Sequence, residues 1–306
     1  MLIVLGDETD LRVQGLCPAL HRQRLPYIVL NNACFPYTLQ LTQSIDDSGQ
    51  DVLFLPGEGV SVPTDEIRAV YYCCQYPFVL RPDDPAEIGD TVYQNINSAF
   101  WSFFYGLAER DCLFVNPIKP ADHHNYKTDV LRCLKADGVR VPATTVTNRP
   151  EAVVAFYEQH ARCIFKPPWG QAFTEELLPK HLKPDMLAKL ANSPTMLQEY
   201  VAGQEIRLYV IGEAVFGVRV ISDALDINED AYTLRQAFEP NDAMVALARR
   251  VAQVAGLVFT AIDMRQTPDG ELVVFEANSS PDFTADEAQA GHPLSDCLAR
   301  LLARVD

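Results

Sequence analysis

Two carboxylates and an amide stand on a segment whose pattern predicts a β-hairpin. Residues 257–278 contain two mainly apolar runs on either side of Asp269-Gly270, a dipeptide that is the strongest short signal for a hairpin turn. If this dipeptide forms a two-residue loop, Asp263 lies directly opposite Glu276. Side chains alternate between the two faces of a strand, so Asn278 projects on the same side as Glu276. The sequence therefore predicts three oxygen ligands at one place.

This set of donors suits a hard divalent cation. Two carboxylates at the ends of otherwise apolar strands would repel each other unless a cation bridged them. Oxygen-rich sets with few protein ligands suit Mg²⁺ that also carries substrate phosphates. The alternative is a solvated hairpin with scattered acids. Acids inside Phe-Thr-Ala-Ile-Asp and Val-Val-Phe-Glu-Ala-Asn are poorly explained as surface residues, which favours the metal site.

The elements that would position this hairpin belong to an α/β chain. Residues 2–30 follow a strand, helix, strand pattern, the start of a parallel βαβ unit. Two prolines within residues 117–120 indicate a domain boundary. Beyond it we expect a helix that begins at Lys127, a hairpin over 206–221 that turns at Gly212-Glu213, and a helix over 241–255.

Composition excludes several classes of function. The 306 residues are enough for about two domains, and the 48% hydrophobic content is ordinary for a globular protein. The 25 Lys and Arg against 41 Asp and Glu give a net charge of −16, which argues against nucleic acid or an anionic membrane as a partner. A small nucleotide remains compatible, because a few local cations can neutralise its phosphates. Runs of apolar residues are too short to predict a membrane span.

Cysteine usage points to a reducing compartment. The eight cysteines form no CxxC motif, and seven of them lie in or beside apolar stretches, so we expect reduced thiols and no zinc site. The N-terminal residues lack the basic region of a signal peptide. These features predict a cytoplasmic protein. The absence of Gly-x-Ser-x-Gly and Gly-x-Gly-x-x-Gly argues against a serine hydrolase and a dinucleotide-binding domain.

Several short motifs over residues 114–283 occur in an order that is more specific than any one of them. They are Phe-Val-Asn-Pro before the Lys127 helix, Gly-Val-Arg-Val-Pro-Ala-Thr-Thr-Val-Thr-Asn-Arg-Pro-Glu at 138–151, Ile-Phe-Lys-Pro at 164–167, Leu-Gln-Glu-Tyr-Val at 197–201, Glu-Ile-Arg at 205–207, Ala-Ile-Asp at 261–263 and Phe-Glu-Ala-Asn-Ser-Ser-Pro at 275–281. With these motifs the chain resembles the ATP-grasp carboxylate–amine ligases. The resemblance is to the branch that contains ribosomal-protein glutamate ligases and microviridin-type (graspetide) peptide ligases.

The resemblance implies a fold and its cofactors. The fold is an α/β (α+β) ATP-grasp fold, with an N-terminal α/β pre-ATP-grasp domain over residues 1–113. A central subdomain over 114–195 and a C-terminal subdomain over 196–306 would clamp ATP between them. The implied cofactors are ATP and Mg²⁺, with Mn²⁺ as an alternative ion.

The resemblance also implies roles for residues at matching positions. The implied nucleotide-binding residues are two phosphate-holding lysines, the adenine segment and a ribose-binding acid: Lys127, Lys166, Gln198, Glu199, Tyr200, Val201 and Glu205. The implied metal ligands are Asp263, Glu276 and Asn278, the same three that the hairpin brings together. Three arginines are candidates for binding the acyl phosphate or the carboxylate, since a guanidinium donates a planar fork of hydrogen bonds: Arg207, Arg219 and Arg235.

The implied reaction joins a carboxylate to an amine. ATP would phosphorylate the carboxylate to an acyl phosphate, and the amine would displace phosphate, which releases ADP. The substrates are either small molecules or peptides, the product is an amide or an ester, and a homodimer is compatible with the family. The alternative from another class is a non-catalytic binding module that senses nucleotide. The intact metal ligands favour the enzyme.

Overall fold

The chain forms two compact units. The computed structural model describes residues 1–45, 51–80, 89–169, 174–222 and 233–304. The first unit consists of residues 1–118, 280–284 and 293–306, and the second consists of 119–279 and 285–292. Among the described residues no helix combines the length and the apolar character that a membrane crossing needs. The division into three domains at residues 113 and 195 stays a prediction.

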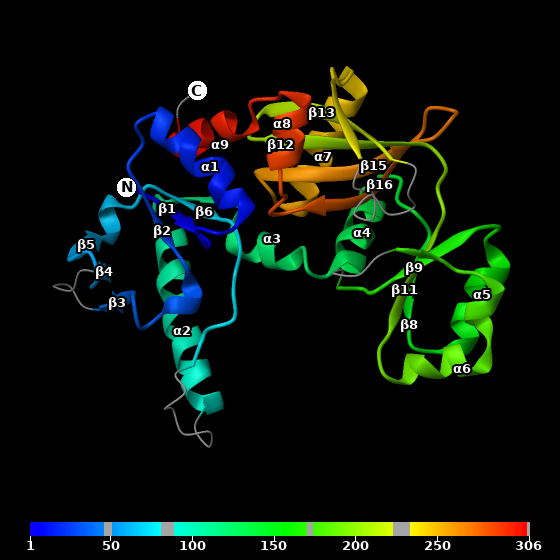
Figure 1. Cartoon of the computed structure of the whole chain (residues 1–306), viewed down its shortest axis with the longest axis horizontal. Coiled ribbons are helices and arrows are strands. Elements are labelled where there is room, and N and C mark those ends of the chain that lie inside the picture. Colours follow the sequence, from blue (N-terminus) through cyan, green and yellow to red (C-terminus); the bar gives the residue numbers. More distant parts are fainter. Residues whose placement is uncertain (46–50, 81–88, 170–173, 223–232, 305–306) are drawn as a thin grey trace. The chain divides into compact units, whose positions relative to one another are not determined.

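The first unit is built on a parallel sheet whose strand order is β2-β1-β6-β7 (Figure 1). Its strands are β1 (Leu2–Leu5), β2 (Tyr27–Leu30), β6 (Ala69–Tyr72) and β7 (Leu113–Val115). A small antiparallel sheet contains β3 (Gln40–Thr42), β4 (Val52–Leu55) and β5 (Val60–Pro63). The helices are α1 (Leu11–Arg22), α2 (Gly89–Ala108) and α9 (Leu294–Ala303). Since β1 pairs with β2 in parallel across α1, the predicted βαβ start is confirmed.

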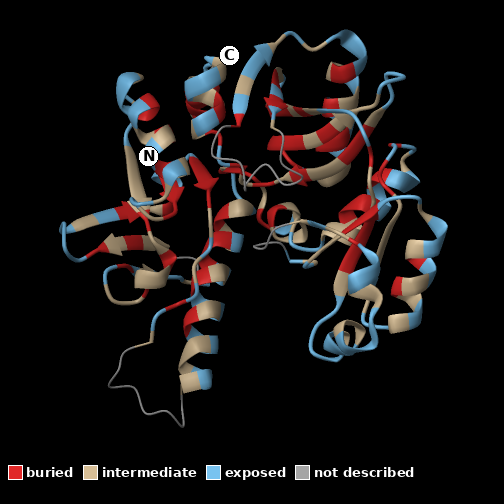
Figure 2. Cartoon of the chain, turned by 45° about the vertical axis from the view of Figure 1, so that its right-hand side comes forward, coloured by how far each residue is buried: buried red, intermediate tan, exposed pale blue. Residues whose placement is uncertain are grey.

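Local sequence explains how α1 is fixed in this unit. Asp10 caps the helix, accepting a hydrogen bond from the Arg12 backbone N–H at 2.9 Å. Buried residues at helical spacing, Val13, Leu16 and Leu20 among them, cover one face. The strand β1 is buried at all four positions. Figure 2 draws buried residues in red throughout the chain.

The C-terminal helix α9 completes the first unit. It packs against α1 and β6. Arg22 at the end of α1 donates to Asp296 of α9 at 2.7 Å, and Arg304 pairs with Asp111 at 2.7 Å. The first unit is therefore assembled from stretches that lie far apart in the sequence.

The second unit contains two antiparallel sheets. The smaller has the order β10-β9-β11-β8 and consists of β8 (Thr144–Thr147), β9 (Cys163–Lys166), β10 (Glu175–Glu176) and β11 (Thr195–Glu199). The helices that follow β8 and β10 along the chain are α5 (Pro150–Gln159) and α6 (Pro184–Leu187). Val153 and Phe156 of α5 pack with Cys163 and Leu197 of the sheet in one apolar cluster.

The larger sheet has the order β14-β13-β12-β15-β16. Its strands are β12 (Gln204–Ile211), β13 (Ala214–Ile221), β14 (Leu234–Phe238), β15 (Phe259–Gln266) and β16 (Leu272–Asn278), and the helices of this region are α3 (Ile118–His123), α4 (Lys127–Ala136), α7 (Asp242–Ala255) and α8 (Thr284–Ala290). The predicted hairpin over 206–221 is confirmed, because Ile211 pairs with Ala214 across Gly212-Glu213.

One face of this larger sheet is apolar. Ile206, Leu208, Ile262 and Met264 pack with residues of α4 and α7 in one apolar cluster, and each is at most 1% exposed. The helix α7 ends at Gly256, whose φ of +69° is the left-handed conformation that suits a glycine C-cap. Because side chains alternate along strands, the residues between these apolar ones project from the other face. That second face, called the polar face below, carries the candidate site.

Candidate active site

The strands β15 and β16 bring Asp263 opposite Glu276, as predicted from the position of the turn. The turn itself differs from the prediction. Gln266 pairs with Leu272 and the Thr267 N–H donates to the Glu271 carbonyl at 2.9 Å, so the loop is the three residues 268–270. Gly270 occupies the left-handed region with φ +89°, as such loops require. The predicted two-residue loop was therefore one residue too short.

A β-bulge next to Asp263 restores the predicted pairing. Asp263 pairs with Glu276, whereas the adjacent Met264 pairs with Val274, so Phe275 is the extra residue on β16. The bulge lets two residues at i and i+2 point to opposite faces. Val274 is buried in the apolar cluster beside α4 and α7, while Glu276 projects from the polar face. The one-residue insertion in the ladder thus compensates for the longer turn.

The three predicted metal ligands lie together on the polar face. The Asn278 side-chain amide donates to Asp263 Oδ2 at 3.0 Å. Glu276 pairs with Lys127 at the start of α4, with Lys127 Nζ 2.9 Å from Oε1. On the other side Arg207 Nε donates to Asp263 Oδ1 at 2.7 Å. This donor set, two carboxylates on paired strands with a neighbouring amide, fits Mg²⁺.

Cations hold the Glu276 carboxylate in its ionised form. Burial raises the pKa of Glu276, but the electrostatic interactions with Lys127, His124 and Lys166 and the hydrogen bond from Lys127 outweigh it, so that pKa lies below its ordinary value. Since the charge of Lys166 acts on Glu276, the structure brings the second predicted phosphate lysine near the metal ligands. His124 Nε2 lies 3.4 Å from Glu276 Oε1, and burial lowers the pKa of its imidazole.

Arg207 and Arg235 lie on the polar face with Asp263. Arg207 pairs with Asp263 across β12 and β15, and Arg235 lies opposite Val220, whose partner on β12 is Glu205. Glu205, Arg207 and Arg235 therefore share one face. Two of the three predicted arginines thus reach the site.

Asp286 joins these two arginines, and the sequence analysis missed it. This residue of α8 is 1% exposed and accepts a hydrogen bond from the Tyr209 hydroxyl at 2.5 Å. Its Oδ2 lies 3.3 Å from Arg207 Nη1. Its Oδ1 lies 2.6 Å from Arg235 Nε, an ion pair without hydrogen-bond geometry at that oxygen. The acid sits in an otherwise ordinary helical segment, and no local pattern marks it.

Arg219 does not lie in the site, which corrects the sequence-based expectation. Arg219 pairs with Ile206, so it projects from the face opposite to Arg207. Its guanidinium lies over the ring of Phe238, 4.6 Å from the ring centroid. The expected contact of Arg219 with substrate has no support in this geometry.

Lys166 and Gln198 share one face of the smaller sheet. Lys166 at the end of β9 pairs with Met196, and Gln198 lies two residues further along β11 on the same side. Gln198 is fully buried, and its amide donates to Thr144 Oγ1 at 3.0 Å. Within the described part of the chain the Gln198 Oε1 atom has no hydrogen-bond partner. This face of the sheet therefore places one cation and one polar acceptor together.

Glu199 projects from the opposite face of β11 and is already engaged. Its Oε1 accepts from the Arg140 guanidinium at 2.8 Å and from the Ala143 N–H at 3.0 Å. Burial raises the pKa of Glu199, but these two donors lower that pKa by more, so the net shift is downward. The side chain fastens the start of β8 to β11, an arrangement that differs from the expected contact with adenine.

Tyr200, Val201 and Glu205 are tied together by Arg265, a second residue that the sequence analysis left without a role. Arg265 Nη1 donates to the Val201 carbonyl at 2.8 Å, and Nη2 lies 3.4 Å from Glu205 Oε2. The Arg265 guanidinium also lies 5.4 Å from the centroid of the Tyr200 ring. Burial raises the pKa of Glu205. Arg265 thus links the segment between the two sheets to the first strand of the larger one.

Comparison with known proteins gives likenesses of structure. No protein-family model matches the sequence, and no curated protein matches it. Solved structures match over almost the whole chain. The ATP-grasp ligase PsnB, solved in complex with a minimal precursor, is 26% identical with a TM-score of 0.83, and the match covers 99% of this chain and 97% of that one. Another PsnB structure, complexed with a phosphomimetic precursor variant, Mg and ADP, is 25% identical with a TM-score of 0.82 over 99% of this chain and 97% of that one.

A third likeness has lower sequence identity and shows the fold alone. The macrocyclase MdnC from Microcystis aeruginosa MRC, bound with precursor peptide MdnA, is 21% identical with a TM-score of 0.85, and the match covers 99% of both chains. The expected α/β fold and the resemblance to the peptide-ligase branch are therefore confirmed. The chain has the ATP-grasp fold and is an ATP-grasp ligase.

Proposed function

We propose that this ligase uses ATP to activate a carboxylate of a peptide and joins it to an amine or hydroxyl, forming an amide or ester bond. The observation that carries the proposal is the pairing of Asp263 with Glu276, with Asn278 beside them and cations on both sides. The PsnB structures have the same fold and hold precursor peptide, and one of them also holds Mg and ADP. A peptide is therefore the substrate class that we favour over a free amino acid.

The metal site would consist of Asp263, Glu276 and Asn278. Bound Mg²⁺, or Mn²⁺ in its place, would polarise phosphate oxygens and neutralise their charge. Lys127, which pairs with Glu276, would supply one positive charge to the phosphates of ATP. Lys166 would supply a second positive charge from the smaller sheet. These side chains bind and neutralise, so the reaction needs no nucleophile from the protein.

The adenine would be read by backbone groups of residues 199–201. Two N–H groups of this segment are already used, because Glu199 donates to the Ala143 carbonyl at 3.0 Å and Tyr200 donates to the Arg162 carbonyl at 3.0 Å. Among the described residues the Val201 N–H makes no backbone hydrogen bond. We assign Val201 N–H as the donor to the adenine ring and the half-buried Glu205 as the acceptor for the ribose hydroxyls.

Arg207 and Arg235 would bind the acyl phosphate. A planar guanidinium suits a phosphorylated carboxylate, and Asp286 and Asp263 hold the two arginines on the polar face. The eight cysteines are free thiols, which supports the proposal of a reducing, cytoplasmic compartment. A homodimer stays a prediction.

A turnover assay tests the proposal. Peptides that contain Asp or Glu together with Lys, Ser or Thr are incubated with Mg·ATP, and release of ADP is followed with the peptide mass. We expect many turnovers of ADP per enzyme and the loss of one water per new bond. Hydroxylamine should trap the acyl phosphate as a hydroxamate. Stoichiometric nucleotide binding without turnover, across the whole peptide set, would instead indicate a nucleotide-sensing module.

A further inference from the structure

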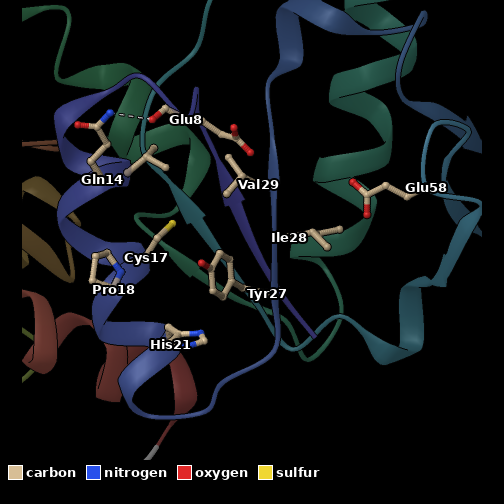
Figure 3. A pocket seen from close by; sticks show the side chains of 10 residues that line it. Glu8, Gln14, Cys17, Pro18, His21, Tyr27, Ile28, Val29 and Glu58 are labelled. Atoms are coloured by element: carbon tan, nitrogen blue, oxygen red, sulfur yellow. Dashed lines mark hydrogen bonds between the residues drawn. The ribbon is translucent and has the colours of Figure 1, made fainter.

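A pocket of the first unit lies at the edge of the parallel sheet, and the proposed chemistry makes no use of it. The pocket has a volume of about 690 Å³ and lies along α1 and β2 (Figure 3). Tyr27 and Val29 line it on the side of α1, whereas Ile28 points the other way, toward Glu58. Residues from both faces of β2 line one pocket only if the pocket opens along the edge of that strand.

The outer edge of β2 has backbone groups available for pairing. In the order β2-β1-β6-β7, taken over the strands that the structure describes, β2 has one neighbour, β1. The carbonyls of Pro26 and Leu30 accept from β1 and the residue after it, at 3.0 Å and 2.9 Å. Because successive residues of a strand point their backbone groups in alternate directions, those of Tyr27 and Val29 point away from β1. Over the described ranges neither residue makes a backbone hydrogen bond on that side.

Such an edge can pair with an added strand, and the residues that line the pocket indicate which side chains that strand would carry. An extended peptide that pairs with β2 would place alternate side chains on the two faces of the sheet. One set would meet the half-buried Tyr27 and Val29. The other set would meet the exposed carboxylate of Glu58, and Glu8 adds a second exposed carboxylate to the lining. The pocket therefore complements apolar residues that alternate with basic ones.

We propose that the edge of β2 docks an extended peptide segment that carries Lys or Arg, as a fifth strand of this sheet. A second copy of the chain fits less well. It would bring another −16 of net charge, and pairing the two β2 edges would place like carboxylates beside each other. The docking site uses none of the proposed catalytic residues, so the proposal stands whether or not the enzyme turns over.

Binding of two short probes tests this proposal. The probes are fluorescein-labelled peptides with alternating Lys and Val or alternating Glu and Val, and fluorescence anisotropy of the full chain is measured at low and high salt. We expect the Lys-Val peptide to bind and the Glu-Val peptide to fail. Glu58→Lys should weaken binding about tenfold. The matched reversal Glu109→Lys, an exposed glutamate outside the pocket, should change it far less.

Backbone pairing is tested from the side of the peptide, which avoids any loss of folding. Only alternate residues of an added strand donate to β2, so N-methylation of one alternate set should abolish binding and N-methylation of the other should leave it. Val29→Pro removes an N–H of β2 that points away from β1, so it should abolish binding as methylation of the donating set does. Equal effects of the two methylation sets, or equal effects of Glu58→Lys and Glu109→Lys, would overturn the proposal. Concentration-dependent dimerisation that Val29→Pro abolishes would assign the edge to a second copy instead.

Discussion

Asp286 offers the sharpest test of how the site holds its arginines. Asp286→Asn keeps the shape of the side chain and an oxygen for the Tyr209 hydroxyl, but it removes the charge between Arg207 and Arg235. Removing one partner of a buried ion pair costs about 3–5 kcal/mol, because the other charge stays buried without compensation. Arg207 keeps its ion pair with Asp263 at 2.7 Å, so we expect the lower end of this range. We expect a loss of about 3 kcal/mol in the free energy of unfolding.

Urea denaturation followed by circular dichroism measures this loss. With a denaturant slope of about 3 kcal/mol per molar, the midpoint should move by about 1 M. Tyr209→Phe removes one hydrogen bond to a charged group and should cost about 1.5–3 kcal/mol. The matched control Asp185→Asn replaces an exposed aspartate and should stay within about 0.5 kcal/mol of the unmodified protein.

A double variant separates the ion pair from general damage. Arg235→Gln combined with Asp286→Asn removes both partners, so its cost should be smaller than the sum of the single costs by about 1 kcal/mol or more. Additive costs would show that Asp286 and Arg235 are not coupled. A midpoint for Asp286→Asn equal to that of Asp185→Asn would refute the assignment of Asp286 to a buried network.

Three further predictions concern the metal ligands, the phosphate lysine and a thiol of the first unit. Glu276→Gln should lower ADP release by about a hundredfold or more but nucleotide affinity by less than about tenfold, and Glu271→Gln on the same hairpin should do neither; equal losses in calorimetry and turnover would contradict this. Lys166→Ala should weaken ATP and ADP binding together, and Lys166→Arg should not restore it fully, since a planar fork differs from a compact ammonium; unchanged ADP affinity would remove this lysine from the site. A hydrogen bond from Cys73 is the main cause that lowers the pKa of Cys74 to about 7. Its alkylation by iodoacetamide should therefore accelerate as the pH rises through about 7, measured against Cys74→Ala, and a rate that rises only near the ordinary thiol pKa of about 8.5 would oppose it.

Local patterns in the sequence were enough for most strands and for the pairing of Asp263 with Glu276. Period-two alternation and the Asp-Gly dipeptide marked the hairpin that pairs Asp263 with Glu276. They could not show that the loop has three residues and that Phe275 bulges, because neither changes the local composition. The longer loop and the bulge cancel at Asp263, so the predicted pair was correct although the predicted turn was not.

The face on which Arg219 lies could have been predicted from the sequence. A turn at Gly212-Glu213 pairs residue 211 with 214, and counting back pairs Arg219 with Ile206. Strand alternation then already places Arg219 on the face opposite to Arg207. Asp286 is different, because its contacts with Tyr209 and Arg235 join residues that are distant in the chain. No pattern within its own helix reports such contacts.

The way in which α9 completes the first unit has a consequence for synthesis on the ribosome. The parallel sheet and α1 are translated early, yet the surface that α9 covers cannot be filled until residues 294–303 have left the exit tunnel. Until then that apolar surface is exposed to aggregation and to chaperones. The same connectivity means that a chimera which exchanges residues 1–118 alone would transplant an incomplete folding unit. Grafting this unit onto a related ligase requires both ends of the chain to be exchanged together.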